Sequence, residues 1–234
     1  MFPSRRIITS GTGFRDDVSC YFDGSDQINL TEVAYNVHNA NYTFSFWMKR
    51  ETWNWDRILS NTTSPNDSTA NKWILLGNEG AKDQISLECD TDNKRIKTDQ
   101  HEGKLNTWYH IVITTNGSGS GAFYENGKSI ALASSGSTND MDAAITIDGI
   151  GQLNNGWIND LAVYDTDIGA AGARELYNDR QPFNHKEGRY ASNLINWWRM
   201  GDGAGDTSTT IKDQAGTNNG TLAGDTALTG DVPW

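Results

Sequence analysis

The chain has 234 residues and carries 19 Lys and Arg side chains against 30 Asp and Glu, which gives a formal net charge of −11. This acidic balance repels phosphate backbones and anionic lipid headgroups, so we expect neither nucleic acid nor a membrane as partner. The opening stretch MFPSRRIITSGTGF contains no long apolar run, so we expect no secretory signal and no transmembrane helix. A protein of this kind that works outside a cell would leave it by another route.

Short segments of strand length recur along the chain and are separated by clusters of Gly, Asn, Asp and Ser. The 9 Trp, 8 Tyr and 7 Phe residues supply large side chains that suit a pleated sheet. This pattern predicts an all-β sandwich or jelly roll. The clearest segments are residues 18–23, 26–30, 42–50, 72–77, 84–89, 107–115, 121–126, 144–151 and 157–165.

Three segments carry a more specific local signal. In residues 42–50 an apolar side chain recurs at every second position, starting at Tyr42 and ending at Met48, which predicts a half-buried strand. The Asn126-Gly127 pair tolerates positive φ angles and predicts a two-residue hairpin turn. Residues 167–179 are the one stretch that predicts a short amphipathic helix, although two glycines weaken it.

Four segments in this order resemble the successive signatures of a laminin-G-like domain of the concanavalin A-like lectin/glucanase superfamily. They are YFDGSDQINL, FSFWMKR, TWYHIVITTNGSGSGAFYENGKSI and GWINDLAVYDTDIGAAGARELYN, and together they span about residues 18–178. The resemblance implies a jelly-roll sandwich of two antiparallel sheets with one short helix and with binding loops at the rim. It indicates the fold more strongly than the function, because one fold hosts many activities.

The last part of the chain departs from this family pattern. The segment NWWRMGDGAGDTSTTIKDQAGTNNGTL follows the resembling region and resembles a stretch that often introduces such a domain. We expect residues 1–17 to form an N-terminal arm and residues 18–234 to form a single domain, in which residues 194–234 add closing strands and a tail. Trp197 and Trp198 would then point to opposite faces of a strand. Two alternatives are the stub of a second module and packing on a neighbouring subunit.

The family resemblance also implies a calcium ion near the first strand's turn or at the rim. The matching positions are Asp23 and Asp26 in YFDGSDQ, and Asp160 in WINDLAV. Calcium takes carboxylate and backbone oxygens as ligands, so calcium is the expected cofactor. The alternative is an ordinary turn, in which Asp23 caps the loop and Gly24 takes the left-handed conformation.

Exposed aromatic side chains beside amide and carboxylate groups can hold a sugar, which stacks its C–H face on an indole ring. Two inter-strand loops offer this combination. The predicted carbohydrate-binding residues are Trp53, Asn54, Trp55, Asp56, Asn154, Asn155 and Trp157. The alternative is that one Trp of each loop plugs the end of the sandwich.

Glycan-cleaving relatives use alternating acids on one strand, and SLECDTDN places Glu88, Asp90 and Asp92 in such a pattern. The residues between them are not apolar, and DTDN equally suits a hairpin tip, so we expect no catalytic residues and no enzyme. The four histidines show no metal-ligand spacing. The two cysteines, Cys20 and Cys89, are too few for a disulfide framework, and buried thiols are the simpler reading.

These observations predict a non-enzymatic, lectin-like virion surface protein of a bacteriophage, either a capsid decoration or a fibre or tail component. The WWRMGD ending resembles that of virion surface proteins of marine bacteriophages. The expected partners are other virion proteins, further copies of the chain and cell-surface glycans of the host, and the basic arm is the expected attachment contact. One alternative is an extracellular bacterial carbohydrate-binding module. A less favoured alternative is a glycan hydrolase that uses Glu88 and Asp92.

Overall fold

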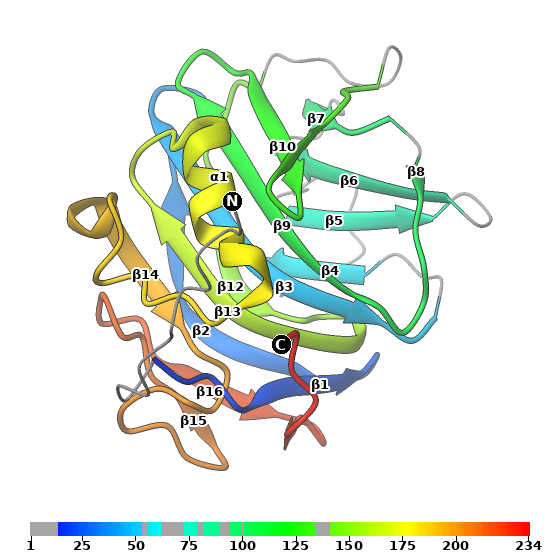
Figure 1. Cartoon of the computed structure of the whole chain (residues 1–234), viewed down its shortest axis with the longest axis vertical. Helices are drawn as coiled ribbons and strands as arrows, with labels where there is room; N and C mark the ends of the chain where they lie inside the picture. The colour runs from blue at the N-terminus through cyan, green and yellow to red at the C-terminus, as the bar shows by residue number, and fades with distance from the viewer. Residues whose placement is uncertain are drawn as a thin grey trace, which may run out of the picture.

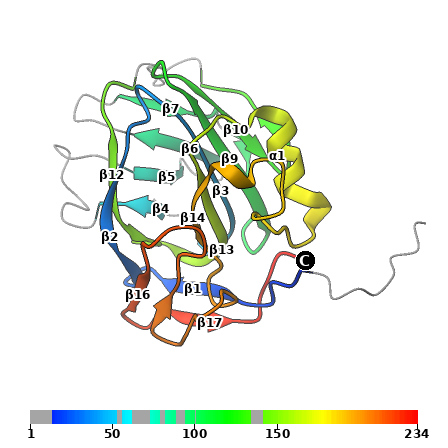
Figure 2. The same cartoon turned by 90° about the vertical axis from the view of Figure 1, so that its left-hand side faces the viewer.

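The computed structural model describes residues 14–52, 56–61, 73–78, 82–88, 94–99, 101–133 and 141–234. The chain folds into two large antiparallel sheets that face each other, with one short helix outside them (Figures 1 and 2). The predicted all-β jelly-roll sandwich is therefore confirmed. In the part of the chain that is described, no helix is both long enough and apolar enough to span a membrane.

The first sheet, sheet A, contains eight strands. Seven of them in spatial order are β11 (Lys128–Ile130), β10 (Gly121–Glu125), β9 (Trp108–Asn116), β3 (Asn41–Arg50), β13 (Asn155–Tyr164), β1 (Ser19–Asp23) and β17 (Ala227–Thr229). The eighth strand, β14 (Leu194–Trp198), pairs with β13.

The second sheet, sheet B, contains nine strands. Eight of them in spatial order are β15 (Thr210–Ile211), β16 (Gly220–Ala223), β2 (Gln27–Tyr35), β12 (Ile145–Ile150), β4 (Asp56–Ser60), β5 (Trp73–Asn78), β6 (Lys82–Glu88) and β7 (Arg95–Lys97). The ninth strand, β8 (His101–Glu102), pairs with β6.

The main hydrophobic core lies between the sheets. The alternating side chains of β3 behave as predicted, because Phe44, Phe46 and Met48 are buried in this core and Tyr42 packs against it. Burial of such large apolar side chains stabilises the sandwich by roughly 2 kcal/mol each.

The α1 helix (Gly169–Tyr177) covers part of the outer face of sheet A, where it buries Ala173 and Leu176 (Figure 1). The helix predicted within residues 167–179 is thus confirmed. Gly172 is required here, because a Cβ atom at that position would lie 2.4 Å from the Ile168 Cβ. Two short 3₁₀ helices, Asn178–Arg180 and Ala191–Asn193, follow α1.

The hairpin between β10 and β11 turns at Asn126 and Gly127, whose φ angles are 49° and 73°. Positive φ at both positions is the geometry of the predicted turn, because it matches the right-handed twist of the strands. Gly127 also lets α1 approach, since a Cβ atom there would lie 3.2 Å from the Arg174 Cα.

The last part of the chain contributes strands to both sheets. β14 and β17 join sheet A, beside β13 and β1, whereas β15 and β16 extend sheet B next to β2. Trp198 is buried in the core between the sheets, and Trp197 is buried in the cluster on the outer face of sheet A. The two rings therefore point to opposite faces, but the outward ring is covered by other side chains instead of facing solvent.

Acidic side chains hold the loops of this C-terminal segment. Asp213 accepts hydrogen bonds through Oδ1 from the backbone N–H groups of Trp197, Ala215 and Gly216. Asp206 accepts three more, from the backbone N–H groups of Gly201, Gly203 and Lys212. The run rich in Gly, Asp, Asn and Thr is therefore a set of tight turns whose backbone donors are satisfied by carboxylates.

Candidate functional site

A row of four side chains crosses the outer face of sheet A. The strand register places Tyr21 opposite Trp157, Trp157 opposite Lys49, and Lys49 opposite Trp108. Directly opposite residues on one sheet face lie about 5 Å apart, so these four side chains touch in sequence. We call Tyr21, Trp157, Lys49 and Trp108 the aromatic row.

The two ends of the aromatic row differ in exposure. Tyr21 and Trp157 are partly exposed, and their ring centroids lie 4.8 Å apart. Lys49 and Trp108 are buried, with exposed fractions of 8% and 7%. The Lys49 Nζ atom lies 3.8 Å from the centroid of the Trp157 ring, which is cation–π contact. The Tyr21–Trp157 pair is therefore the part that a ligand can reach.

Carboxylates border this row. The Tyr21 hydroxyl donates a hydrogen bond to Glu51 Oε2 at 2.9 Å, and the Trp108 Nε1–H donates to Asp231 Oδ1 at 2.9 Å. The Lys49 ammonium also pairs with Asp231. Burial would raise the pKa of Asp231, but the hydrogen bonds from Lys49 and Trp108 outweigh it and lower that pKa. Both partners keep Asp231 ionised, and the buried ammonium is neutralised in place.

Part of the predicted sugar site lies at the same end of the sandwich. Trp157 belongs to the aromatic row, and the Asn155 backbone N–H donates to Asp56 Oδ1 at 3.2 Å. Asp56 is fully buried and pairs with Arg50 at 2.6 Å, and Asn154 is only 1% exposed. Asp56 therefore joins the two segments beneath the surface and Asn154 is buried, whereas Trp157 and Asn155 are the members that reach solvent. Trp53, Asn54 and Trp55 lie outside the described residues.

The three predicted calcium ligands do not converge. Asp23 and Asp26 share one turn, in which Asp23 Oδ1 accepts from the Ser25 backbone N–H at 2.8 Å and Asp26 Oδ2 accepts from the Asp23 backbone N–H at 3.2 Å. Asp160 lies further along β13, about 16 Å from the residue opposite Asp23 at about 3.3 Å per residue. No cluster of three or more His, Cys, Asp or Glu side chains suited to a metal occurs in the described ranges.

Asp160 belongs to a different network, on the outer face of sheet A. Its Oδ1 accepts from the Trp197 Nε1–H at 2.6 Å, and its Oδ2 lies 3.0 Å from His185 Nε2. The other His185 nitrogen pairs with the Tyr164 hydroxyl. Burial would raise the pKa of Asp160, but His185 and these hydrogen bonds outweigh burial and lower the pKa. Each oxygen of this buried carboxylate thus has a protein partner, and neither Asp23 nor Asp26 lies beside it.

The residues considered for glycan hydrolysis are described only in part. Glu88 is buried and accepts hydrogen bonds from the Ser86 hydroxyl at 3.1 Å and from Arg95 at 3.4 Å. Asp90 and Asp92 lie outside the residues that the structure describes. Glu88 therefore has a structural partner on the neighbouring β7 strand.

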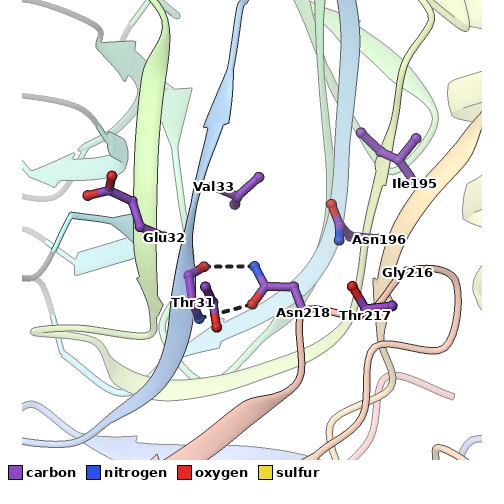
Figure 3. Close-up of a pocket in the computed structure, with 8 residues that line it drawn as sticks. All are labelled: Thr31, Glu32, Val33, Ile195, Asn196, Gly216, Thr217 and Asn218. Carbon is purple, nitrogen blue, oxygen red and sulfur yellow. Dashed lines mark hydrogen bonds between the residues drawn. The ribbon is translucent and has the colours of Figure 1, made fainter.

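A groove of about 380 Å³ lies between β2, β14 and the loop before β16 (Figure 3). The sequence gives no sign of this groove, because its walls come from segments far apart in the chain. The groove is lined by Thr31, Glu32, Val33, Ile195, Asn196, Gly216, Thr217 and Asn218.

Most of the aromatic row was also missed. The alternation of β1, β3 and β9 could have suggested Tyr21, Lys49 and Trp108 as outward residues, but only the register places them beside Trp157.

A family model for the concanavalin A-like lectin/glucanases superfamily matches residues 22–171. Among solved structures, the chain is similar to a protein from Bacteroides ovatus ATCC 8483 to which carbohydrate binding is ascribed. The TM-score is 0.57 with 13% identity, over 89% of this chain and 60% of that one. The chain thus spans less than two thirds of that protein.

A second similar structure is the native heptameric SAP-like pentraxin from Limulus polyphemus. The TM-score is 0.55 with 16% identity, over 88% of this chain and 95% of the pentraxin chain. At such identities the likeness concerns the fold alone. No curated protein matches the sequence.

Proposed function

The chain belongs to the concanavalin A-like lectin/glucanase superfamily, and we propose that it is a non-enzymatic glycan-binding protein whose contact surface is the exposed end of the aromatic row. The observation that carries this proposal is the Tyr21–Trp157 pair, two partly exposed rings 4.8 Å apart on an open sheet face. Aromatic rings that expose a face accept the C–H face of a pyranose, and neighbouring polar groups bind its hydroxyls.

The charges around the pair favour a neutral sugar. Glu51 is exposed and hydrogen-bonded to Tyr21, and Asp23 lies two residues from Tyr21 on the same strand face. The hydrogen bonds from Ser25 lower the pKa of Asp23, so this carboxylate stays ionised at neutral pH. Lys49, the cation of the row, is buried and already paired with Asp231. Acidic sugars would therefore be repelled.

A glycan array with the full chain tests this proposal, run once with calcium and once with EDTA. Trp157→Ala should strongly weaken binding to neutral glycans without changing the unfolding temperature much, because the ring is partly exposed. Leu153→Ala, which removes an exposed apolar side chain from the loop just before β13, is the matched control and should bind like the wild type. Binding that persists unchanged in Trp157→Ala would overturn this site.

We also propose that the protein acts on a virion surface, as a decoration, fibre or tail component. The WWRMGD segment, residues 197–202, and the basic N-terminal arm support this setting. The root of the arm is fixed, since Asp202 Oδ2 accepts from the Val18 backbone N–H at 2.6 Å and Arg199 stacks 4.4 Å from the Phe14 ring centroid. The alternative setting is an extracellular bacterial carbohydrate-binding module.

Deletion of residues 1–13 separates these settings, because it leaves the anchored root intact. In the virion setting, the truncated protein keeps its unfolding temperature and its glycan binding but is no longer incorporated into particles. Unchanged incorporation would remove the arm from that role. Release of reducing sugar from a polysaccharide panel, lost in Glu88→Gln, would instead support the hydrolase alternative.

A further inference from the structure

The groove between β2 and β14 has a rigid polar end. At residues 30–32 the β2 strand bulges away from its pairing with β12, and β16 pairs with β2 only over residues 27–29. The Asn218 side chain replaces the missing strand: its Nδ2 donates to the Thr31 carbonyl at 2.9 Å, and its Oδ1 accepts from the Thr31 N–H at 3.0 Å (Figure 3). A primary amide has two donors and two lone pairs, so one of each remains for a ligand.

The wall behind this end is fixed by a buried network. Asn196 Oδ1 accepts from the Tyr35 hydroxyl at 2.9 Å, and Asn196 Nδ2 donates to Asp213 Oδ2 at 2.7 Å. The same Asp213 oxygen accepts from the Asn218 backbone N–H at 3.1 Å. The amides that face the groove are therefore held in position before any ligand arrives, which lowers the entropy cost of binding.

The rest of the lining is apolar or carries a hydroxyl group. Val33 and Ile195 come from β2 and β14, and Thr217 is exposed beside them. Within the described part of the chain, the Thr217 hydroxyl has no hydrogen-bond partner of its own. The Glu32 side chain points away from the other lining side chains (Figure 3).

The lining residues carry no Lys, Arg or His, so they offer no cation to an anionic ligand. The volume of about 380 Å³ lies at the small end of the usual range for ligand pockets. We infer that the groove is a second saccharide subsite, which takes one residue of a neutral sugar with its C–H face against Val33 and Ile195 and its hydroxyls against Asn218 and Thr217. This site extends the proposed glycan binding but does not depend on the aromatic row.

Nuclear magnetic resonance of the ¹⁵N-labelled full chain tests this inference. The probes are the methyl glycosides of glucose, galactose, mannose and N-acetylglucosamine, together with methyl glucuronide as the charged counterpart. The expected result is that at least one neutral glycoside shifts the amide signals of Thr31, Val33 and Asn218, and that the glucuronide shifts them much less.

Three variants separate the two sites. Thr217→Phe fills the groove while it keeps the backbone hydrogen bonds of the loop, and it should abolish these shifts. Thr209→Phe makes the same change at an exposed position that does not line the groove, and it should leave them unchanged. Trp157→Ala should also leave them unchanged.

Two results would overturn the subsite. One is that no neutral glycoside shifts the groove signals, and the other is that Thr217→Phe binds like the wild type. If shifts instead appear only around Tyr21 and Trp157, the groove is not a sugar site and the proposed function still holds. If the groove signals shift but Trp157→Ala keeps all array binding, the groove carries the binding and the aromatic row does not.

Discussion

Trp197 and Trp198 are neighbours in the chain, yet they lie in different hydrophobic clusters on opposite faces of β14. The Asp213 carboxylate fixes this strand, since its Oδ1 accepts the Trp197 backbone N–H at 2.9 Å. The same carboxylate accepts hydrogen bonds from four other donors, in Asn196, Ala215, Gly216 and Asn218. One buried side chain thus connects β14, the C-terminal loop and the wall of the groove.

Replacement of this carboxylate should be costly. Asp213→Ala leaves several buried donors without an acceptor, so we expect the free energy of unfolding to fall by about 3 kcal/mol or more. Urea denaturation followed by tryptophan fluorescence measures this loss. Asp225→Ala, a change at an exposed aspartate in the same segment, is the control and should change stability by less than about 0.5 kcal/mol. Similar values for the two variants would contradict the anchoring role of Asp213.

The Asp160 network gives a second prediction. Asp160→Ala removes the acceptor of the Trp197 indole N–H and of His185 in a buried site, so the free energy of unfolding should fall by about 3 kcal/mol. The low pKa of the native carboxylate means that this contribution is present above the unfolded pKa of Asp and is lost as the pH falls through the lower folded value. Chemical denaturation at neutral and acidic pH checks both points.

Calcium binding can be separated from this network. Asp160 is used by His185 and Trp197, so any calcium-dependent rise in unfolding temperature should disappear in Asp23→Asn and persist in the milder Asp160→Asn. Thermal unfolding in calcium and in EDTA measures this. Loss of a calcium response in Asp160→Asn alone would show that the ion binds at that position after all.

Asp16 should weaken the fold as the pH rises. Its carboxyl group is fully buried, and burial together with Asp160 and Asp202 raises its pKa from 3.8 to about 10, although the Arg199 guanidinium acts in the opposite direction. Between these pH values the folded chain keeps a proton that the unfolded chain releases, so stability falls with rising pH.

Asp16→Asn removes this titration. We expect the variant to be more stable than the wild type by about 1 kcal/mol or more at neutral pH, with a gain that grows towards about pH 9 and shrinks towards about pH 4. Urea denaturation across this pH range provides the measurement. A gain that does not vary with pH would show that Asp16 stays ionised in the folded chain.

The Cys20 thiol is buried in the core, and burial raises its pKa. A thiolate is the reactive form, so Cys20 should not react with a water-soluble thiol reagent in the native state. The Cys89→Ser variant isolates this thiol, because Cys20 and Cys89 are the 2 cysteines of the sequence. We expect no labelled thiol before denaturation and complete labelling afterwards; labelling of the native variant would indicate that the core opens at β1.

Much of the fold could be predicted from short-range patterns. The alternation in β3, the Asn126-Gly127 turn and the short helix each depend on residues close together in the chain, and all three agree with the structure. The three predicted calcium ligands do not lie together, for the opposite reason. Asp160 shares β13 with Trp157, but a register shift between Asn159 and Ala162 turns the backbone there, with a φ of 50° at Asp160. A bulge of this kind has no clear sequence signal.

The sequence by itself determined the all-β sandwich, because hydrophobic periodicity and turn residues act over a few positions and decide which face of each strand is buried. Only the tertiary structure decided which surfaces meet. The register of β1, β13, β3 and β9 creates the aromatic row. The groove is closed by the hydrogen bonds between Asn218 and Thr31, which are 187 positions apart in the sequence. Such contacts depend on how strands align after the chain has folded, and local patterns carry no information on that alignment.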